Sequence, residues 1–174
     1  MASTWGDLLR TGLRRVTRAI KPRARTAPRR TRGAPPTGHE ALPDFKGRVI
    51  PAYAPRLDGD ADPGEVVWTW VPFEDDPSQG KDRPVLVVGR DNPYLLGLML
   101  TSKDHSRNSE KEARHGRHWM DIGSGDWDSQ HRPSEIRLDR VLRVDPSRVR
   151  REGSIMPRRV FDQIMESLAA VKGW

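Results

Sequence analysis

Apolar and β-branched residues recur in short stretches from residue 65 onward, and turn residues separate the stretches. This pattern is typical of β-strands. The predicted strands cover residues 65–71, 83–90, 94–101, 117–122 and 135–144. Clusters of Asp, Asn, Pro and Gly predict turns at 75–77, 91–93 and 123–125. Several short strands at this spacing favour a small β-barrel over a parallel sheet.

The period changes near the C-terminus, where apolar residues lie three or four positions apart. This spacing predicts a helix with one apolar face. Pro157 suits the first turn of that helix and Gly173 suits its exit. We expect the helix to close one end of the barrel. The apolar positions are Val160, Phe161, Ile164, Met165, Leu168 and Val171.

Residues 1–20 also carry one helical apolar stripe, with arginines largely off it. Two interpretations remain open: a basic amphipathic helix that docks on a partner or a membrane surface, or a short helix that frays. Gly6 and Gly12 favour the second, because each costs about 1 kcal/mol relative to Ala. Contact of this arm with a membrane is therefore not expected.

Residues 21–62 are rich in Pro, Arg, Gly and Ala and have almost no apolar periodicity. They predict a disordered linker, because such a segment cannot bury enough surface to fold. The composition changes at Pro63 and Gly64. The sequence thus predicts a mainly β domain with a C-terminal helix over residues 63–174, preceded by a disordered basic arm.

The net charge of +7 indicates nucleic acid, but the charge is unevenly placed. Residues 1–50 carry +9 and the remainder carries −2, so RNA binding by the folded part must depend on local residues. The sequence contains no cysteine, which excludes disulfides and thiolate metal sites. Its apolar stretches are too short to span a bilayer, and a cytoplasmic protein is expected.

Candidate catalytic residues stand at the ends of predicted strands. Arg83 leads into an apolar strand, and Thr101 and Ser102 end another. Alternation along 135–144 would place Arg137 and Asp139 on one face. Taken singly, each of these features is more often structural. No glycine-rich phosphate loop is present, and the pair His115 and His118 lacks further ligands, so neither a cofactor nor a metal is expected.

Together these pieces resemble the MazF/PemK family of toxins. The matching motifs are Gly64-Glu-Val-Val-Trp68, Ser78-Gln-Gly80, Arg83-Pro-Val-Leu-Val-Val88, Leu100-Thr-Ser102 and Glu135-Ile-Arg-Leu-Asp-Arg140, over about residues 63–172. The resemblance implies an SH3-like barrel that forms a homodimer. It also implies a sequence-selective endoribonuclease that cuts single-stranded RNA and is neutralised by a small antitoxin protein. Binding of DNA by the toxin–antitoxin complex belongs to the same expectation.

The resemblance also implies roles for single residues. Asp139 would be the base, Arg137 the acid or the stabiliser of charge, and Arg83 the ligand of the scissile phosphate, with hydrogen bonds from Thr101 and Ser102. An arginine is a poor proton donor, so the electrostatic role is favoured for Arg137. No metal is required. The predicted RNA contacts are Gln79, Lys103, Arg107, Trp127 and Arg140, and Trp127 is the tryptophan expected to be exposed.

One feature departs from the family, because Glu74, Asp75 and Asp76 fill the first hairpin loop, where some members have a histidine. Carboxylates there would repel RNA phosphate. Two alternatives therefore remain beside the ribonuclease. The barrel could bind nucleic acid or an antitoxin without turnover, or it could inhibit a larger enzyme by protein contact.

Overall fold

The computed structural model describes residues 41–105 and 109–174. The predictions for residues 1–20, for 21–40 and for Arg107 lie outside this part. The elements are β1 (Glu65–Pro72), β2 (Gly80–Asp91), β3 (Tyr94–Thr101), α1 (Ser109–Arg114), β4 (Trp119–Gly123), β5 (Ser134–Arg137), β6 (Leu142–Val144), the 3-10 helix η2 (Pro146–Arg148), β7 (Arg151–Ile155) and α2 (Arg158–Lys172).

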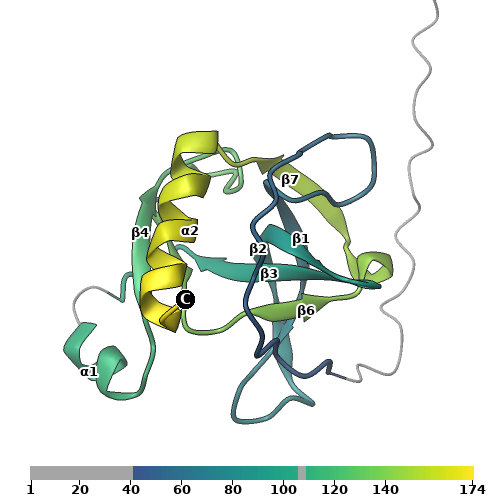
Figure 1. The fold of residues 1–174 in the computed structure, drawn as a ribbon. Helices are drawn as coiled ribbons and strands as arrows, with labels where there is room; N and C mark the ends of the chain where they lie inside the picture. The colour runs from purple at the N-terminus through teal and green to yellow at the C-terminus, as the bar shows by residue number, and fades with distance from the viewer. Residues whose placement is uncertain (1–40, 106–108) are drawn as a thin grey trace, which may run out of the picture. The chain divides into compact units, whose positions relative to one another are not determined.

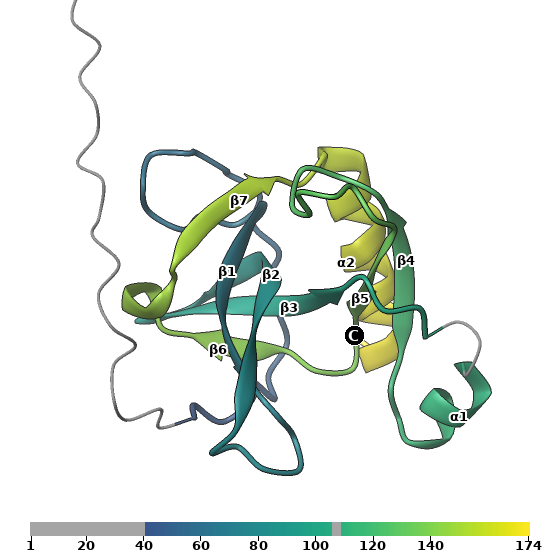
Figure 2. The same cartoon turned by 180° about the vertical axis from the view of Figure 1, so that it is seen from behind.

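The strands form one antiparallel sheet in the order β4-β5-β3-β2-β1-β7, and β6 also pairs with β3. The sheet curves strongly, and β4 lies on the opposite side of the domain from β6 and β7 (Figures 1 and 2). Alternate residues of β1 and β2 enter two separate apolar clusters, as Val66 and Val67 illustrate. Burial on both faces explains why the strand around Val85 is a continuous apolar run. The mainly β fold with a C-terminal helix is confirmed.

The predicted strand 135–144 is split into β5 and β6. In the register Leu100↔Ile136, an unbroken strand would set Asp139 opposite Gly97, but Gly97 pairs with Leu142. The extra residues bulge out of the ladder between the two strands. Such bulges bend a strand and re-aim its side chains. The polar residues between β5 and β6 are thereby free to serve a site instead of continuing the sheet.

Helix α2 matches its prediction. Gly173 ends it in the left-handed conformation, φ 70°, and its N–H donates to the carbonyl of Ala169. The buried face packs into the larger apolar cluster, against residues such as Ile122. Figure 1 shows the helix beside β4, at one end of the sheet. Its buried residues are Phe161, Ile164, Met165 and Leu168.

Residues 41–62, which the composition assigned to a linker, pack against the barrel. Phe45 forms a bridge with Val141, Val49 is 2% exposed, and the Tyr53 hydroxyl donates to the carbonyl of Met156 at 2.8 Å. The fully buried carboxylate of Glu65 accepts the backbone N–H of Arg56 at 2.6 Å. Single anchors spaced along an irregular segment give no periodicity, so the sequence pattern could not identify them.

A substitution at one anchor tests this packing. We expect Val49→Ala to lower the free energy of unfolding of the full chain by about 2 kcal/mol, because it removes buried methyl groups and leaves a cavity. Urea denaturation measures the change. The neighbouring Ile50 is 83% exposed and provides the matched control, Ile50→Ala, for which little change is expected. Equal effects of the two substitutions would show that the segment is not packed as described.

Candidate functional site

A cavity of about 470 Å³ opens between the β1–β2 loop, the end of β3 and the segment from α1 to β4. Its lining mixes both signs of charge, with the cations in excess. The carboxylates are Glu74, Asp75 and Glu112. The cations are Lys81, Arg83, Lys103, Arg117, Arg137 and Arg140.

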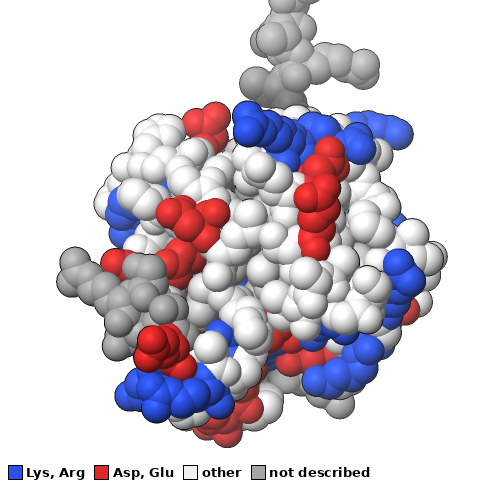
Figure 3. All heavy atoms as spheres, turned by 60° about the vertical axis from the view of Figure 1, so that its left-hand side comes forward, with Lys and Arg blue, Asp and Glu red and all other residues white. Residues whose placement is uncertain are grey.

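The excess of cations in the cavity is a local feature. On the face shown in Figure 3, acidic and basic side chains interleave and no single basic field covers the surface.

Arg83 and Thr101 come from neighbouring strands. Continuing the Val85↔Met99 register by two residues sets Arg83 opposite Thr101, and both line the cavity. The Thr101 hydroxyl accepts the backbone N–H of Lys103 at 3.1 Å, which fixes it at the end of β3. Burial lowers the pKa of Arg83 below its ordinary value. Within residues 41–105 and 109–174 no carboxylate pairs with Arg83, so its guanidinium is available to an anion.

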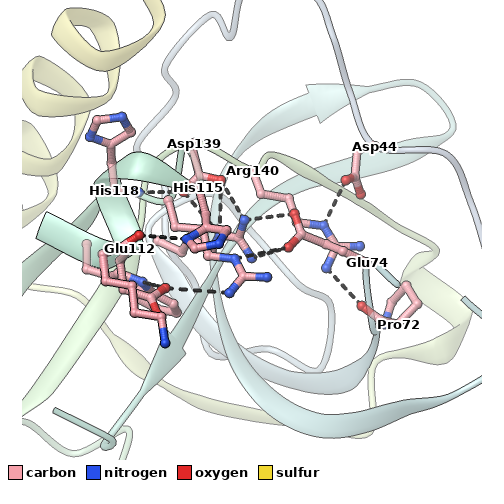
Figure 4. A network of polar contacts seen from close by, with 12 residues as sticks. Asp44, Pro72, Glu74, Glu112, His115, His118, Asp139 and Arg140 are labelled. Atoms are coloured by element: carbon pink, nitrogen blue, oxygen red, sulfur yellow. Dashed lines mark hydrogen bonds and ion pairs between the residues drawn. The ribbon is translucent and has the colours of Figure 1, made fainter. Parts of the chain in front are cut away.

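Arg137 is the most constrained group of the site. Its side chain is 7% exposed and its guanidinium is held by two carboxylates. Asp139 accepts from Nε at 3.0 Å and from Nη2 at 2.6 Å. Glu74 accepts from Nη1 at 3.0 Å and from Nη2 at 2.7 Å. Figure 4 shows Glu74 and Asp139 in the same polar network, although they come from the β1–β2 loop and from the bend after β5.

The ion pairs decide the protonation of this cluster. Burial alone would raise the pKa of Asp139 and of Glu74, but hydrogen bonds from Arg137 outweigh it and hold both pKa values below the ordinary ones. Burial alone would lower the pKa of Arg137, but the bonds to Asp139 and Glu74 raise it. Arg137 therefore keeps its charge and cannot serve as a proton donor, which agrees with an electrostatic role.

Residues 62–171 match the family model described as "PemK-like, MazF-like toxin of type II toxin-antitoxin system". The chain belongs to this family. No curated protein matches the sequence significantly. Two crystal structures of MazE-MazF from Deinococcus radiodurans, Form-II and Form-III, are similar at 16% and 15% sequence identity with a TM-score of 0.46 each, and each match covers 65% of this chain and 96% of the other.

The cavity brings together part of the predicted catalytic set of this PemK-like chain. Arg83, Thr101 and Arg137 line it. Asp139 does not line it, because the bend after β5 places its carboxylate against Arg137 and the backbone N–H of His118. Ser102 is exposed and also lies outside the lining.

The predicted RNA contacts are scattered. Lys103 lines the cavity and is exposed. Arg140 lines it too, but its guanidinium is held by Asp44 at 2.7 Å and by the carbonyl of Pro72 at 2.8 Å. Gln79 is exposed and donates to Asp76 within the β1–β2 loop, away from the lining. Among the predicted RNA contacts that the structure describes, only Lys103 lines the cavity without a side-chain bond to another described residue.

The expected exposure of Trp127 was wrong. The ring is 4% exposed, its Nε1 donates to the Ser134 hydroxyl at 3.1 Å, and it packs against Gly125, where a Cβ would lie 2.1 Å from the ring. The flanking acidic residues suggested a surface position, but the glycine two residues earlier leaves room for the ring to fold inward. Trp127 belongs to the core and cannot stack an RNA base in this fold.

Sequence reasoning missed two cavity residues, His105 and Glu112. His105 and Trp119 line the cavity and stack face to face, with ring centroids 4.0 Å apart. Glu112, on helix α1, accepts from Trp119 Nε1 at 3.4 Å. No local pattern marks these residues. Only the pairing of β4 with β5, in which Trp119 faces Arg137, could have indicated them.

His115 and His118 lie between α1 and β4. His115 is exposed and its Nδ1 contacts the carbonyl of Lys111 at 2.7 Å. Across residues 41–105 and 109–174, no group of three His, Cys, Asp or Glu side chains gathers that could hold a metal ion. None of the helices in the same residues is long and apolar enough to cross a membrane.

The two carboxylates on Arg137 are expected to differ in their contribution to stability. Asp139 is 16% exposed and Glu74 is 35% exposed. We expect Asp139→Asn to lower the free energy of unfolding at pH 7 by about 2 kcal/mol, because it weakens a mostly buried charge pair. The control Glu74→Gln should cost less than about 1 kcal/mol, because that carboxylate is more exposed to solvent.

The pH dependence of that difference follows from the lowered pKa of Asp139. A lowered folded pKa stabilises the protein above the unfolded pKa of about 3.9, and the gain is lost as the pH falls through the folded value. The gap between wild type and Asp139→Asn should therefore narrow below about pH 4 in urea denaturation. A gap that is unchanged or widens on acidification would contradict the pairing.

Proposed function

We propose that this chain is the toxin of a type II toxin–antitoxin pair and an endoribonuclease that cleaves single-stranded RNA without a metal. One observation carries the proposal. The partly buried guanidinium of Arg83, which pairs with no carboxylate in the described part of the chain, lies with Thr101 and Arg137 in one net-positive cavity. A phosphate in a chain of RNA needs cationic and hydroxyl donors of this kind.

The proposed reaction is attack of a ribose 2′-hydroxyl on the adjacent phosphate. It needs a base at the 2′-oxygen, a proton for the leaving 5′-oxygen, and donors where negative charge builds on phosphorus. Arg83 would bind the phosphate and Thr101 would donate to it. Arg137 would stabilise the developing charge. Single-stranded RNA suits a cavity of this kind, because its 2′-hydroxyl and its phosphate are both accessible.

Asp139 serves this reaction best by positioning Arg137. Its oxygens already accept from Arg137 and from the backbone N–H of His118, and its lowered pKa makes it a weak base. A general base must reach the hydroxyl whose proton it takes. Asp139 lies outside the cavity lining, so we assign to it the orientation of the guanidinium.

Glu74 occupies the place on Arg137 that a phosphate would take. Its two oxygens accept hydrogen bonds from Nη1 and Nη2, in the bidentate geometry that phosphate also adopts on arginine. RNA that reaches Arg137 must therefore displace this carboxylate. The acidic hairpin loop, which departs from some members of the family, then competes with the substrate and does not by itself exclude the enzyme.

The proposed partners are single-stranded RNA, a second copy of this chain and a cognate antitoxin. The family model describes a toxin of a type II toxin-antitoxin system, and such a toxin has an antitoxin partner. An antitoxin segment that covers the cavity would block Arg83. DNA binding by such a complex and a cytoplasmic location belong to the same proposal.

A binding module without turnover is the second candidate function. The observation that favours it is the position of Glu74 and Asp75 in the cavity, where both carboxylates oppose a phosphate. A module of this kind would bind RNA or an antitoxin and leave RNA intact.

Cleavage of a mixed-sequence single-stranded RNA by the purified full chain, in the presence of EDTA, tests the enzyme directly. We expect few cut sites, and we expect Arg83→Ala to lower the rate at least about 100-fold, because a donor to the reacting phosphate is lost. The matched control is Arg90→Ala, since Arg90 follows Arg83 on β2 but pairs with Asp62 and lies outside the cavity lining. Intact RNA that remains bound to folded wild-type protein would favour the binding module.

Removal of the competing carboxylate is expected to strengthen binding. Glu74→Gln should raise the affinity for a 2′-O-methyl oligonucleotide, which cannot be cleaved, by about fivefold at low salt, because one negative charge near the phosphate is lost. Fluorescence anisotropy measures the dissociation constant. Asp162→Asn is the control, because Asp162 pairs with Arg158 on the exposed side of α2. An unchanged or weaker affinity of Glu74→Gln would show that RNA does not displace Glu74.

A further inference from the structure

His105, which lines the cavity, forms a polar pair with Glu135, separate from the Arg137 cluster. His105 Nδ1 lies 3.0 Å from Glu135 Oε2, and the backbone N–H of His105 donates to the same carboxylate at 3.2 Å. The side chains are 15% and 14% exposed. The imidazole also stacks on Trp119 with an interplanar angle of 5°. Contacts through the backbone, the ring edge and the ring face therefore fix the orientation of His105.

The topology places this pair beside the proposed phosphate site. Glu135 faces Thr101 in the pairing of β3 with β5, and it precedes Arg137 by two residues on the same strand face. His105 lines the same cavity as Arg83 and Thr101. Because Nδ1 is held by the carboxylate, Nε2 is the ring nitrogen left for a ligand, and no hydrogen bond to Nε2 occurs among the described residues.

A carboxylate that holds one nitrogen of an imidazole fixes its tautomer and makes the other nitrogen a better proton acceptor. Arg137 cannot take this role, because its bonds to Asp139 and Glu74 keep it charged, and Asp139 lies outside the cavity lining. Arg83 is unsuited as well, because an arginine side chain is not deprotonated in proteins.

We propose that His105, oriented by Glu135, is the general base of this site, an inference that rests on the proposed ribonuclease function. Nε2 takes the proton of the ribose 2′-hydroxyl as the 2′-oxygen bonds to phosphorus. The bond from phosphorus to the 5′-oxygen breaks, and the leaving oxygen takes a proton from water. The products are a 2′,3′-cyclic phosphate and a 5′-hydroxyl, and His105 returns its proton to solvent.

Several charged groups contact His105 or line the same cavity. Glu135 of β5 contacts it directly. Glu112 of α1 accepts a hydrogen bond from Trp119, on which His105 stacks. Lys103, Arg117 and Arg137 line the same cavity. A histidine that acts as a base must be unprotonated, so the cleavage rate should fall as the pH is lowered. The acid limb of the profile is the signature of this group.

The test compares variants of the full chain on one RNA that the wild type cleaves. His105→Gln should lower the cleavage rate about 100-fold or more and remove the acid limb, while the affinity for a 2′-O-methyl oligonucleotide changes less than about twofold. Glu135→Gln should keep the acid limb, because His105 is still present. His115→Gln is the matched control, because His115 is exposed and lies outside the cavity lining. Thermal unfolding verifies that each variant folds.

Two further measurements separate other roles of His105. His105→Phe keeps an aromatic ring over Trp119, so near-normal cleavage by this variant would assign stacking to His105 and overturn the proposal. A substrate with a 5′-bridging sulfur has a better leaving group, and recovery of His105→Gln on it would assign the acid role instead. Cleavage by His105→Gln at the rate of His115→Gln also overturns the inference. If the folded wild type cuts no RNA, the proposed function itself fails.

Discussion

The guanidinium of Arg137, held between Asp139 and Glu74, is the interaction on which the site depends. It joins β5, the bend that follows β5 and the β1–β2 loop, which lie far apart in the sequence. A charge this buried is tolerated only when it is paired and hydrogen-bonded. The position of the hairpin loop over the cavity and the direction of the bend are thus parts of one electrostatic constraint.

The change of register along β3 makes this constraint possible. The end of β3 pairs with β5 and its beginning pairs with β6, and the residues between the two strands leave the ladder. Asp139 accepts hydrogen bonds from Arg137, whereas Arg140 donates to Asp44 and to the carbonyl of Pro72 at the end of β1. Lys172 of α2 donates to the carbonyl of Asp139, so the helix end also holds the bend. An unbroken strand would have sent these groups to alternate faces of the sheet.

Local pattern was sufficient for the elements that bury a regular face. The strands around Val85 and helix α2 have the periodicity of their burial, and the family resemblance led to Arg83, Thr101 and Arg137. The pattern failed where contacts are long-range. Val49 belongs to an irregular segment but is buried against the barrel. The ring of Trp127 packs against Gly125 and lies in the core. No neighbour in sequence indicates a stack such as that of His105 on Trp119.

The proposed competition between Glu74 and a phosphate would have a structural consequence for Arg137. If one oxyanion replaces the other, the guanidinium is never left buried without a partner, and the desolvation cost of an unpaired charge does not arise in either state. Asp139 holds Nε throughout and keeps the guanidinium in place during the exchange. Glu74 would have to leave, by a change of its side chain or of the hairpin loop to which it belongs. On this proposal the site is pre-organised for an anion before RNA binds, with a carboxylate in the position that the phosphate would take.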